Sequence, residues 1–511
     1  MENRSIKNRF AVSTLGNLIK GALTFMATLF IARGLGPEHY GSYIFLLSGF
    51  TAMRAILDMG TGAAFHTFIS QKPRSSTFYI IYAIWQFFQF IFPLVIIAFF
   101  FPQEWLEIIW VGHERSLILL AFATIFFQQM AWPTMIHIGE SKRLTQRVQA
   151  LNISISAVNL ILVVGAYALE ILTIPLLFWI LVIQYILALG FAFKVLSVFK
   201  VKKEPLNIKS MLREYLSYCL PLIIGSWLGF ASEFADRWLL QKFGGAEEQA
   251  FFMVGLRFAT IVLLATTSML NIFWKEIAEA QENKNLVRLR ELYRKVSRFL
   301  YTVSAVIAGF LVPWSPTIAT LMLGSSYAAA SSVLPLMLIF SVHASLGQVN
   351  GTFLLSSGKT KTIVIMESIF LVISIPVSYL IQAPYDALIP GFNLGSVGMA
   401  WKAILLNITW VNCVSWWVAK NNGWKFDWAY QVVGLTGALA IGWISYELVM
   451  KMSSILTLNI FLQGTVTFAI YGILIGVFIW FLPWLTGFSQ REVQMMFSKI
   501  IHLIFSKKAK L

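Results

Sequence analysis

The sequence predicts an all-α polytopic membrane protein, and three observations support that fold class. Of its 511 residues, 58% are hydrophobic and only 12% are charged, whereas soluble domains average roughly 25% charged residues. The apolar residues are grouped in blocks of about 20, the length at which a helix crosses the hydrocarbon core. Because these blocks are too long for the strands of a membrane barrel, we expect helices.

The blocks predict about fourteen transmembrane helices, joined by connections too short to form a soluble domain. Their approximate limits are residues 10–32, 41–69, 77–101, 116–138, 149–168, 171–193, 215–241, 249–274, 297–322, 328–356, 362–382, 395–419, 430–450 and 455–483.

Basic residues predict the orientation of these helices. Thirty of the 39 Lys and Arg residues lie at the termini or in loops that follow even-numbered spans, if Arg298 at the very start of the ninth span is counted with its loop, and the other loops hold only four. Because basic residues are retained on the cytoplasmic side, both termini are predicted to be cytoplasmic. The same rule accounts for the net charge of +16, so a nucleic-acid partner is not expected.

Two similar segments indicate an internal duplication. "FIARGLGPEHYGSY" follows the first span and "LLQKFGGAEEQAFF" follows the seventh, so that Gly36 aligns with Gly245. Both copies start on the same side of the membrane, as in transporters whose substrate site lies between two repeated halves. The predicted parts are an N-lobe at 1–200, a C-lobe at 208–420, two additional transmembrane helices at 428–484 and a cytoplasmic amphipathic tail at 487–511.

Ionisable side chains inside the predicted spans are the candidate functional residues, since such groups are costly in hydrocarbon unless they face a cavity or a partner. They lie on polar faces of the first two helices of each predicted lobe. Lys20 and Arg257 have no obvious acid within their own helices, so we assign them to a cavity. The candidate substrate-binding residues are Asn17, Lys20, Arg54 and Arg257.

The other charges leave two interpretations open. Arg54 and Asp58 are one helical turn apart, and the same spacing recurs in the seventh span, so each pair is either a structural salt bridge or part of a site. Glu367 either titrates with transport or pairs with Lys402. The residues assigned to coupling or salt bridges are Asp58, Glu233, Asp236, Arg237 and Glu367.

Nothing in the sequence indicates catalysis. We found no metal-ligand cluster, phosphate-binding loop or nucleophile motif, so no catalytic residue, metal or cofactor is predicted. His66 and His343 are single histidines on long apolar spans and are predicted to be satisfied interior residues.

A turn of the form R-x-LG-P-x-x-YG follows the first span, and D-x-G stands near the end of the second. The residues are Arg33, Leu35, Gly36, Pro37, Tyr40, Gly41, Asp58 and Gly60. This pattern resembles the Wzx-type polysaccharide flippases, the oligosaccharide-flippase branch of the MOP superfamily. The fourteen spans, duplicated lobes and cytoplasmic termini extend the resemblance over the whole chain.

The resemblance implies two six-helix bundles in the bacterial plasma (inner) membrane, working by alternating access. The implied substrate is an undecaprenyl-diphosphate-linked oligosaccharide, carried to the periplasmic face for surface polysaccharides such as O-antigen. Lys20, Arg54 and Arg257 would hold its anionic diphosphate. The implied partners are this lipid-linked oligosaccharide, membrane lipids, a polysaccharide polymerase and other assembly proteins.

Two other functions compete with a flippase. A MATE-like multidrug antiporter shares the superfamily but exports cations and would favour acids in its cavity, which Lys20 and Arg54 argue against. A membrane-embedded polysaccharide polymerase or ligase usually needs a sizeable outer loop. The longest outer connections, near 102–115 and 383–394, are only about a dozen residues long.

Overall fold

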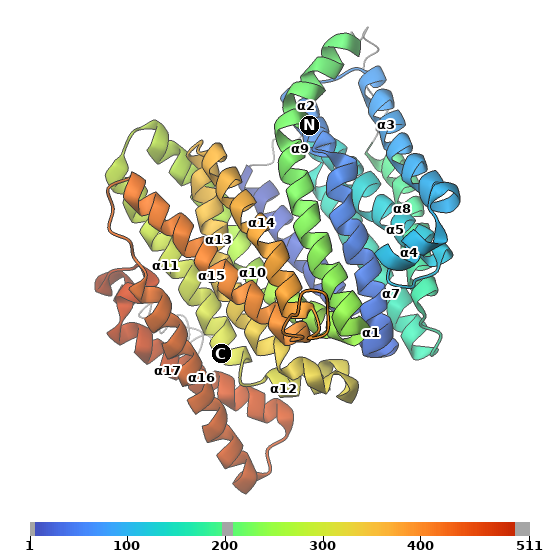
Figure 1. Cartoon of the computed structure of the whole chain (residues 1–511). Coiled ribbons are helices and arrows are strands. Elements are labelled where there is room, and N and C mark those ends of the chain that lie inside the picture. Colours follow the sequence, from blue (N-terminus) through green and yellow to red (C-terminus); the bar gives the residue numbers. More distant parts are fainter. Residues whose placement is uncertain (1–5, 197–207, 496–511) are drawn as a thin grey trace, which may run out of the picture. The chain divides into compact units, whose positions relative to one another are not determined.

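The computed structural model describes residues 6–196 and 208–495, and all regular elements in these ranges are helical (Figure 1). The predicted all-α class is therefore confirmed. Most of the predicted C-terminal amphipathic tail lies outside the described residues. The α-helices are α1 (Ile6–Asp58), α2 (Thr61–Gln71), α3 (Ser76–Val95), α4 (Gln103–Ile109), α5 (Arg115–Phe126), α6 (Trp132–Ser141), α7 (Thr145–Ala168), α8 (Ile174–Val195), α9 (Ile208–Leu239), α10 (Gly245–Glu282), α11 (Leu286–Leu311), α12 (Ser315–Ile318), α13 (Val333–Ser356), α14 (Thr360–Gln382), α15 (Gly395–Asn421), α16 (Ala429–Leu456) and α17 (Ile460–Phe481).

Short irregular helical segments extend or interrupt several of these helices. Four are π-helical: η1 (Ile96–Phe100), η2 (Phe127–Ala131), η3 (Leu240–Gly244) and η4 (Ala319–Leu323). Two are 3₁₀-helical: η5 (Ser325–Ser331) and η6 (Pro483–Thr486).

The number of membrane crossings can be compared with the fourteen predicted. Among the described residues, 11 helices are long and apolar enough to cross a membrane, or 12 if one bent pair counts as a single span. Two of them, Val12–Asp58 and Ile208–Leu264, are 47 and 57 residues long, more than twice the roughly 20 residues that one crossing needs. Each contains a glycine turn, at Gly36 or Gly245. Each therefore has the length of two crossings. Counting both helices twice, and the bent pair Leu286–Leu311 and Ser315–Leu323 as one span, gives the predicted fourteen.

The two turn glycines share an unusual backbone conformation. Gly36 has φ 71° and ψ 171°, and Gly245 has φ 85° and ψ 179°. Residues with a Cβ atom essentially never adopt this combination. The sequence aligned these two glycines as equivalent positions of the repeat, and their matching geometry agrees with that alignment. The segments also pack together, since a Cβ atom on Gly41 would overlap the carbonyl oxygen of Ala246.

The chain forms two compact units. Unit 1 comprises Met1–Met253, Met322–Tyr327 and Leu371–Met399, and unit 2 comprises Val254–Leu321, Ala328–Phe370 and Ala400–Leu511. Helices α10, α14 and α15 contribute to both units. Unit 1 thus contains segments of both predicted lobes, and the division at 1–200 and 208–420 stays a prediction.

In unit 1, α1 packs chiefly against α7 and α9. An aromatic cluster lies beside it, in which the rings of Phe65 and Tyr82 stack with centroids 4.0 Å apart. Arg74, only 9% exposed, forms two hydrogen bonds of 3.0 and 2.8 Å with the Glu214 carboxylate and lies over the Phe78 ring. Such a bidentate pair fixes geometry as well as charge, so it ties the chain after α2 to α9.

In unit 2, α11 packs against α13 and α16. A Cβ atom on Gly442 would overlap the carbonyl oxygen of Gly309, so small residues allow α11 and α16 to approach closely, as is common between membrane helices. His343 on α13 is buried, as predicted, and its Nε2 lies 3.2 Å from the Tyr301 hydroxyl. That hydroxyl donates to the Gln431 carbonyl oxygen, which connects the three helices.

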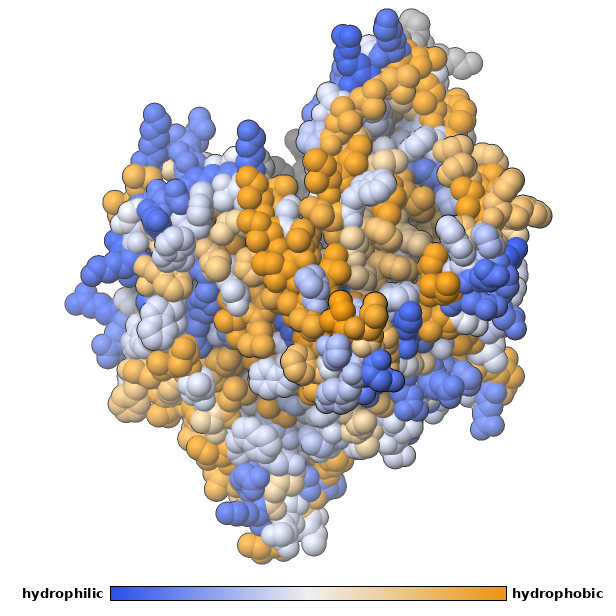
Figure 2. Space-filling model, in the orientation of Figure 1, coloured by the Kyte–Doolittle hydropathy of each residue, from blue (hydrophilic) through white to orange (hydrophobic). Residues whose placement is uncertain are grey.

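Many large apolar side chains point outward instead of into these cores. The exposed ones include Phe87 and Phe92 on α3, Leu187 on α8, Ile224 on α9 and Phe468 on α17. Figure 2 shows hydrophobic surface along α9 and over α3. In water such a surface would be an association site, whereas a lipid bilayer solvates it. The chain is therefore a multi-pass membrane protein.

The close approach at Gly41 generates a stability prediction. We expect Gly41→Ala to destabilise the protein by about 1–3 kcal/mol, the usual effect of overpacking, because the backbone at Ala246 must move. Gly165→Ala on α7 is the matched control, since its Cβ would meet nothing within 4 Å and alanine favours helix by about 0.5–1 kcal/mol. Thermal unfolding of the purified variants measures the difference. Equal melting temperatures for the two variants would contradict the packing described here.

Candidate functional site

The cations predicted for the site in unit 1, Lys20 and Arg54, lie on opposite sides of Gly36 in α1. Lys20 is 16 residues before the glycine and Arg54 is 18 residues after it. At 1.5 Å per residue they stand about 24 and about 27 Å from the turn along their helices. Because successive spans run in opposite directions, both cations reach a similar depth. That depth is past the midplane of a core about 30 Å thick, on the side away from the turn.

Neither of these cations is neutralised in the structure. Lys20 and Arg54 are both exposed, and neither forms a hydrogen bond or an ion pair with any residue that the structure describes. Asn17, one turn before Lys20, is exposed as well. An exposed, unpaired cation at membrane depth is stable only where water or an anion reaches it. The assignment of these residues to a substrate cavity stays a prediction.

The suspected salt bridge between Arg54 and Asp58 is not formed. The Asp58 carboxylate instead accepts a hydrogen bond of 2.8 Å from the Gly62 backbone N–H and one of 3.1 Å from the Thr61 hydroxyl. Both donors belong to the first turn of α2, where backbone N–H groups lack partners within the helix. The left-handed Gly60 brings them within reach. Asp58 therefore caps α2, and Arg54 is left available to another anion.

The charged cluster of α9 also differs from the predicted pairing. Glu233 is exposed and has no cation within 4.0 Å among the described residues. Arg237 lies over the ring of Phe252, 5.1 Å from its centroid. Asp236 accepts a hydrogen bond from the Ser378 hydroxyl, which ties α9 to α14 within unit 1. The predicted Glu233–Arg237 salt bridge is therefore absent, and Asp236 is the acid with a structural contact.

In unit 2, the predicted residues are spread over different helices. Arg257, 12 residues after Gly245 on α10, is exposed and has no partner in the described part of the chain. Glu367 on α14 is exposed and makes no described ion pair, so the pair with Lys402 is not formed. Lys402 itself is buried, with only 5% of its surface exposed.

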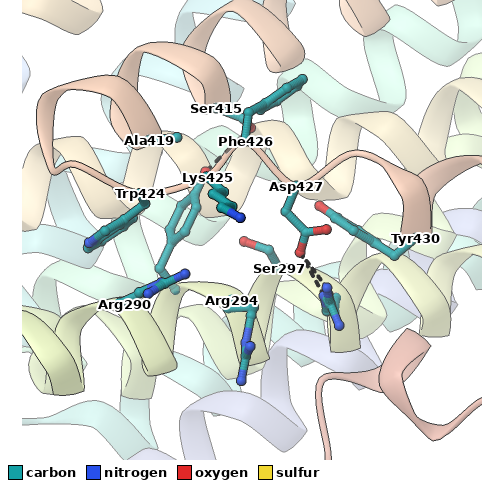
Figure 3. A pocket seen from close by; sticks show the side chains of 12 residues that line it. Arg290, Arg294, Ser297, Ser415, Ala419, Trp424, Lys425, Phe426, Asp427 and Tyr430 are labelled. Carbon is teal, nitrogen blue, oxygen red and sulfur yellow. Dashed lines mark hydrogen bonds and ion pairs between the residues drawn. The ribbon is translucent and has the colours of Figure 1, made fainter.

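A cavity of about 220 Å³ in unit 2 gathers basic residues that sequence reasoning missed (Figure 3). It lies between α11 and the segment that joins α15 to α16. In the sequence these residues counted only as loop charges. The overlooked signal was the i, i+4 spacing of arginines on one face of α11. The lining residues are Arg290, Tyr293, Arg294, Ser297, Arg298, Ser415, Ala419, Trp424, Lys425, Phe426, Asp427 and Tyr430.

One cluster in unit 1 could hold a metal ion. His66 from α2 stacks on His137 from α6 with ring centroids 4.1 Å apart, and Glu140 lies one turn after His137. Their ligand atoms all lie within 4.8 Å of one another. Nδ1 of His137 is buried without a hydrogen-bond partner in the described part of the chain. Two imidazoles, a carboxylate and water form a common Zn²⁺ ligand set. His66 is therefore not the isolated interior residue that the sequence predicted.

Two models of known protein families match parts of the chain. The family model described as "Polysaccharide biosynthesis protein" matches residues 6–273, which is more than half of the chain. The model named "MatE" matches residues 221–380. No curated protein matches the sequence.

Solved structures with the same fold are found at low sequence identity. A lipid II flippase, MurJ, in an inward closed conformation is 15% identical and has a TM-score of 0.68, with 92% of this chain and 99% of that one covered. An inward-facing multidrug resistance MATE family transporter is 17% identical with a TM-score of 0.60, covering 79% and 94%. A MOP superfamily transporter from Pyrococcus furiosus is 16% identical with a TM-score of 0.54, covering 82% and 96%. The chain has the fold of these transporters.

The cap formed by Asp58 is testable. We expect Asp58→Ala to destabilise the protein by about 0.5–2 kcal/mol, the usual effect of losing a helix cap, and Asp58→Asn to have a smaller effect because its amide oxygen still accepts. Thermal unfolding of the purified variants measures both. If Asp58→Asn melts like the unchanged protein but has lost its transport activity, Asp58 acts as a titrating acid. Helix capping alone would then not explain its role.

The histidine cluster predicts metal-dependent stability. At a Zn²⁺ concentration 100 times the dissociation constant, one site stabilises the folded state by about 2.7 kcal/mol, so the melting temperature should rise. His137→Ala should abolish the rise, while His39→Ala, which removes an exposed histidine, should retain it. Zinc content after desalting gives the stoichiometry. A rise that survives His137→Ala would show that zinc binds elsewhere.

Proposed function

Since the chain belongs to the polysaccharide biosynthesis protein family, we propose that it is a flippase for an undecaprenyl-diphosphate-linked oligosaccharide. It moves this repeat unit from the cytoplasmic to the periplasmic face of the bacterial inner membrane, for surface polysaccharides such as O-antigen. Both termini are cytoplasmic. The fold shared with transporters of the MOP superfamily supports transport as the activity. The proposed substrate rests on the charged residues of α1.

The observation that carries the proposal is the pair of unneutralised cations on α1. A lipid-linked oligosaccharide has an anionic diphosphate between an apolar tail and a polar glycan. Lys20 and Arg54 offer it two positive charges at similar depth, on the predicted cytoplasmic side of the midplane. At an effective dielectric of about 20, an ion pair at 4 Å gains about 4 kcal/mol. Arg257 on α10 belongs to unit 2, and its part in binding the diphosphate stays a prediction from the sequence.

The mechanism follows from where these charges lie. The diphosphate displaces water from Lys20 and Arg54, while Asn17 offers a side-chain amide one turn away. Alternating access then exposes the bound headgroup to the other face, and the apolar tail stays in lipid. Glu233 and Glu367 are the candidate coupling acids with free carboxylates in the described chain. Asp236 is held by Ser378, so its protonation would release a contact inside unit 1.

A cation antiporter is the second candidate, because the MatE model matches residues 221–380 and Glu233 and Asp236 fall in that range. An exported organic cation would be repelled by Lys20 and Arg54. The acids of α9 would then have to neutralise those charges, and Glu233 forms no such pair among the described residues. The flippase accounts for the free cations directly.

Translocation assays test the proposal. We expect Lys20→Gln and Arg54→Gln each to slow translocation of a lipid-diphosphate oligosaccharide in proteoliposomes by about 10- to 100-fold, since hydrogen bonds to charged groups contribute about 1.5–3 kcal/mol. Lys451→Gln, which removes an exposed cation at the end of α16, is the control and should transport normally. Melting temperatures establish that all three variants fold.

Three outcomes would overturn the proposal. Full activity of the Lys20→Gln and Arg54→Gln variants would remove the cationic site. Export of cationic drugs from a pump-deficient strain, without glycan translocation, would favour the antiporter. Consumption of the lipid-linked glycan in sealed vesicles, without its appearance on the other face, would favour a polymerase or ligase.

A further inference from the structure

The cationic cavity of unit 2 has a row of arginines that helix energetics do not favour. Arg290, Arg294 and Arg298 succeed one another at i, i+4 on α11, so their guanidinium groups lie along one face. Like charges at this spacing destabilise a helix by roughly 0.2–0.5 kcal/mol per pair. Lys425, from the segment after α15, brings a fourth cation to the same cavity. Four positive charges this close together are stable when a bound anion neutralises them.

The protein's own acids neutralise only part of α11. Arg298 is paired with Asp427, Lys295 with Glu492 and Arg288 with Glu276, at N···O distances of 2.7, 2.7 and 2.5 Å. Bonds from Lys295 and from Ser489 lower the pKa of Glu492 to about 2, so that acid stays charged at neutral pH.

The unpaired cations of this region are those that face the cavity. Arg290, Arg294 and Lys425 have no acid within 4.0 Å in the described chain, although Glu291 directly follows Arg290 and lines an adjoining hollow. All three side chains are exposed and can reach an incoming ligand. All three line the cavity. In Figure 3, Arg290 and Lys425 lie toward Trp424, whereas Asp427 lies beside Tyr430 at the other end.

Polar side chains joined by hydrogen bonds form the floor of the cavity. The Tyr293 hydroxyl donates to Asn350 Oδ1 at 2.7 Å, and Asn350 Nδ2 donates to Ser415 Oγ at 3.0 Å. Ser297 is 3% exposed, and its hydroxyl has no hydrogen-bond partner in the described chain and points into the cavity (Figure 3). A buried hydroxyl without a partner is unfavourable. A ligand oxygen would satisfy it.

The size and surroundings of the cavity select the ligand. Its volume of about 220 Å³ is below the roughly 300–1,000 Å³ of sites for drug-sized molecules, so it suits a compact anion such as a phosphate group. A second hollow, of about 350 Å³, shares Arg290, Arg294 and Trp424 and is bordered by Leu286 and Val287. These last two side chains are 58% and 71% exposed, which offers an apolar path beside the cations.

We propose that this cavity binds a phosphate ester group, held by Arg290, Arg294 and Lys425, and that a membrane phospholipid with a net negative charge supplies it. The phosphate oxygens accept from the two guanidinium groups and from the Ser297 hydroxyl. Arginine suits this role because its planar fork matches phosphate geometry. The acyl chains follow the apolar border, and Trp424 lies at the boundary, where tryptophan is favoured. This site is independent of the transport activity proposed above.

Native mass spectrometry of the full-length protein in neutral detergent tests the proposal. The probes are phosphatidylglycerol and phosphatidylcholine with identical acyl chains. We expect one phosphatidylglycerol to bind at least tenfold more tightly than phosphatidylcholine. The variant Arg290→Gln/Arg294→Gln/Lys425→Gln should lose this preference. The charge-matched control Lys209→Gln/Arg213→Gln/Lys361→Gln removes three exposed cations elsewhere and should keep it.

A second variant separates shape from charge. Ala419→Phe fills the cavity and leaves every cation in place, so it should weaken phosphatidylglycerol binding as the triple substitution does. If the triple pocket variant and the charge-matched control lose the preference for phosphatidylglycerol equally, the preference comes from diffuse surface charge and the proposed site is wrong. Unchanged binding to a folded Ala419→Phe variant would do the same.

Inorganic phosphate distinguishes the two sources of the ligand. We expect it to compete with phosphatidylglycerol only at millimolar concentrations, because it lacks the acyl chains that contact the apolar border. If inorganic phosphate binds at micromolar concentrations and phosphatidylglycerol does not bind, the ligand is a soluble phosphate and the assignment to a lipid is overturned. If neither probe binds the unchanged protein, the whole proposal fails.

Discussion

The backbone conformation at Gly36 and Gly245 is the constraint on which much of this structure depends. With φ near +80° and ψ near 180°, these positions accept essentially only glycine, and each joins two helices that would otherwise run on as one. The depth of every intramembrane charge on α1 and α10 is then a matter of counting residues from the turn. Lys20 and Arg54 lie at a similar depth in the membrane because 16 and 18 residues separate them from Gly36.

Features that depend on periodicity and composition could be predicted from the sequence. The all-α class, the spans and the paired glycine turns follow from the 20-residue apolar blocks and from two aligned segments. The local role of Asp58 was not predicted, because the i, i+4 spacing to Arg54 suggested a salt bridge. The Asp58 carboxylate instead accepts from the Gly62 N–H and the Thr61 hydroxyl at the start of α2, and the backbone N–H is fixed in place, whereas an arginine side chain can rotate away.

Features that depend on tertiary contacts could not be predicted. His66 and His137 are 71 residues apart in the sequence, and Arg294 and Lys425 lie still further apart. Arg74 and Glu214 meet across 140 residues. In each case the sequence shows ordinary single residues, and only the packing of the helices makes them neighbours. Even so, the arginines at i, i+4 on α11 were visible in the sequence, and their mutual repulsion was a reason to expect an anion.

The two groups of cations work in different dielectric surroundings. Charges within a span interact at a lower effective dielectric than charges in bulk water, which is why we propose only two of them, Lys20 and Arg54, as the cations that hold a diphosphate. The cations around the cavity of α11 are exposed, where a single ion pair contributes about 1 kcal/mol at 4 Å and salt weakens it. Such a site needs several converging cations and a buried hydrogen-bond donor, which Arg290, Arg294, Lys425 and Ser297 provide.

The charge of the proposed substrate also bears on the energy source for transport. A diphosphate diester carries about two negative charges, and the outer face of an energised inner membrane is positive. At about 2.3 kcal/mol per charge per 100 mV, outward movement of two charges across a potential of about 100 mV gains about 4.6 kcal/mol from the potential alone. The potential alone would thus drive outward movement in the proposed cycle, before any proton is coupled to it. In the return step of that proposed cycle an ionised Glu233 would balance the vacated cations Lys20 and Arg54, whereas a protonated Glu233 would not.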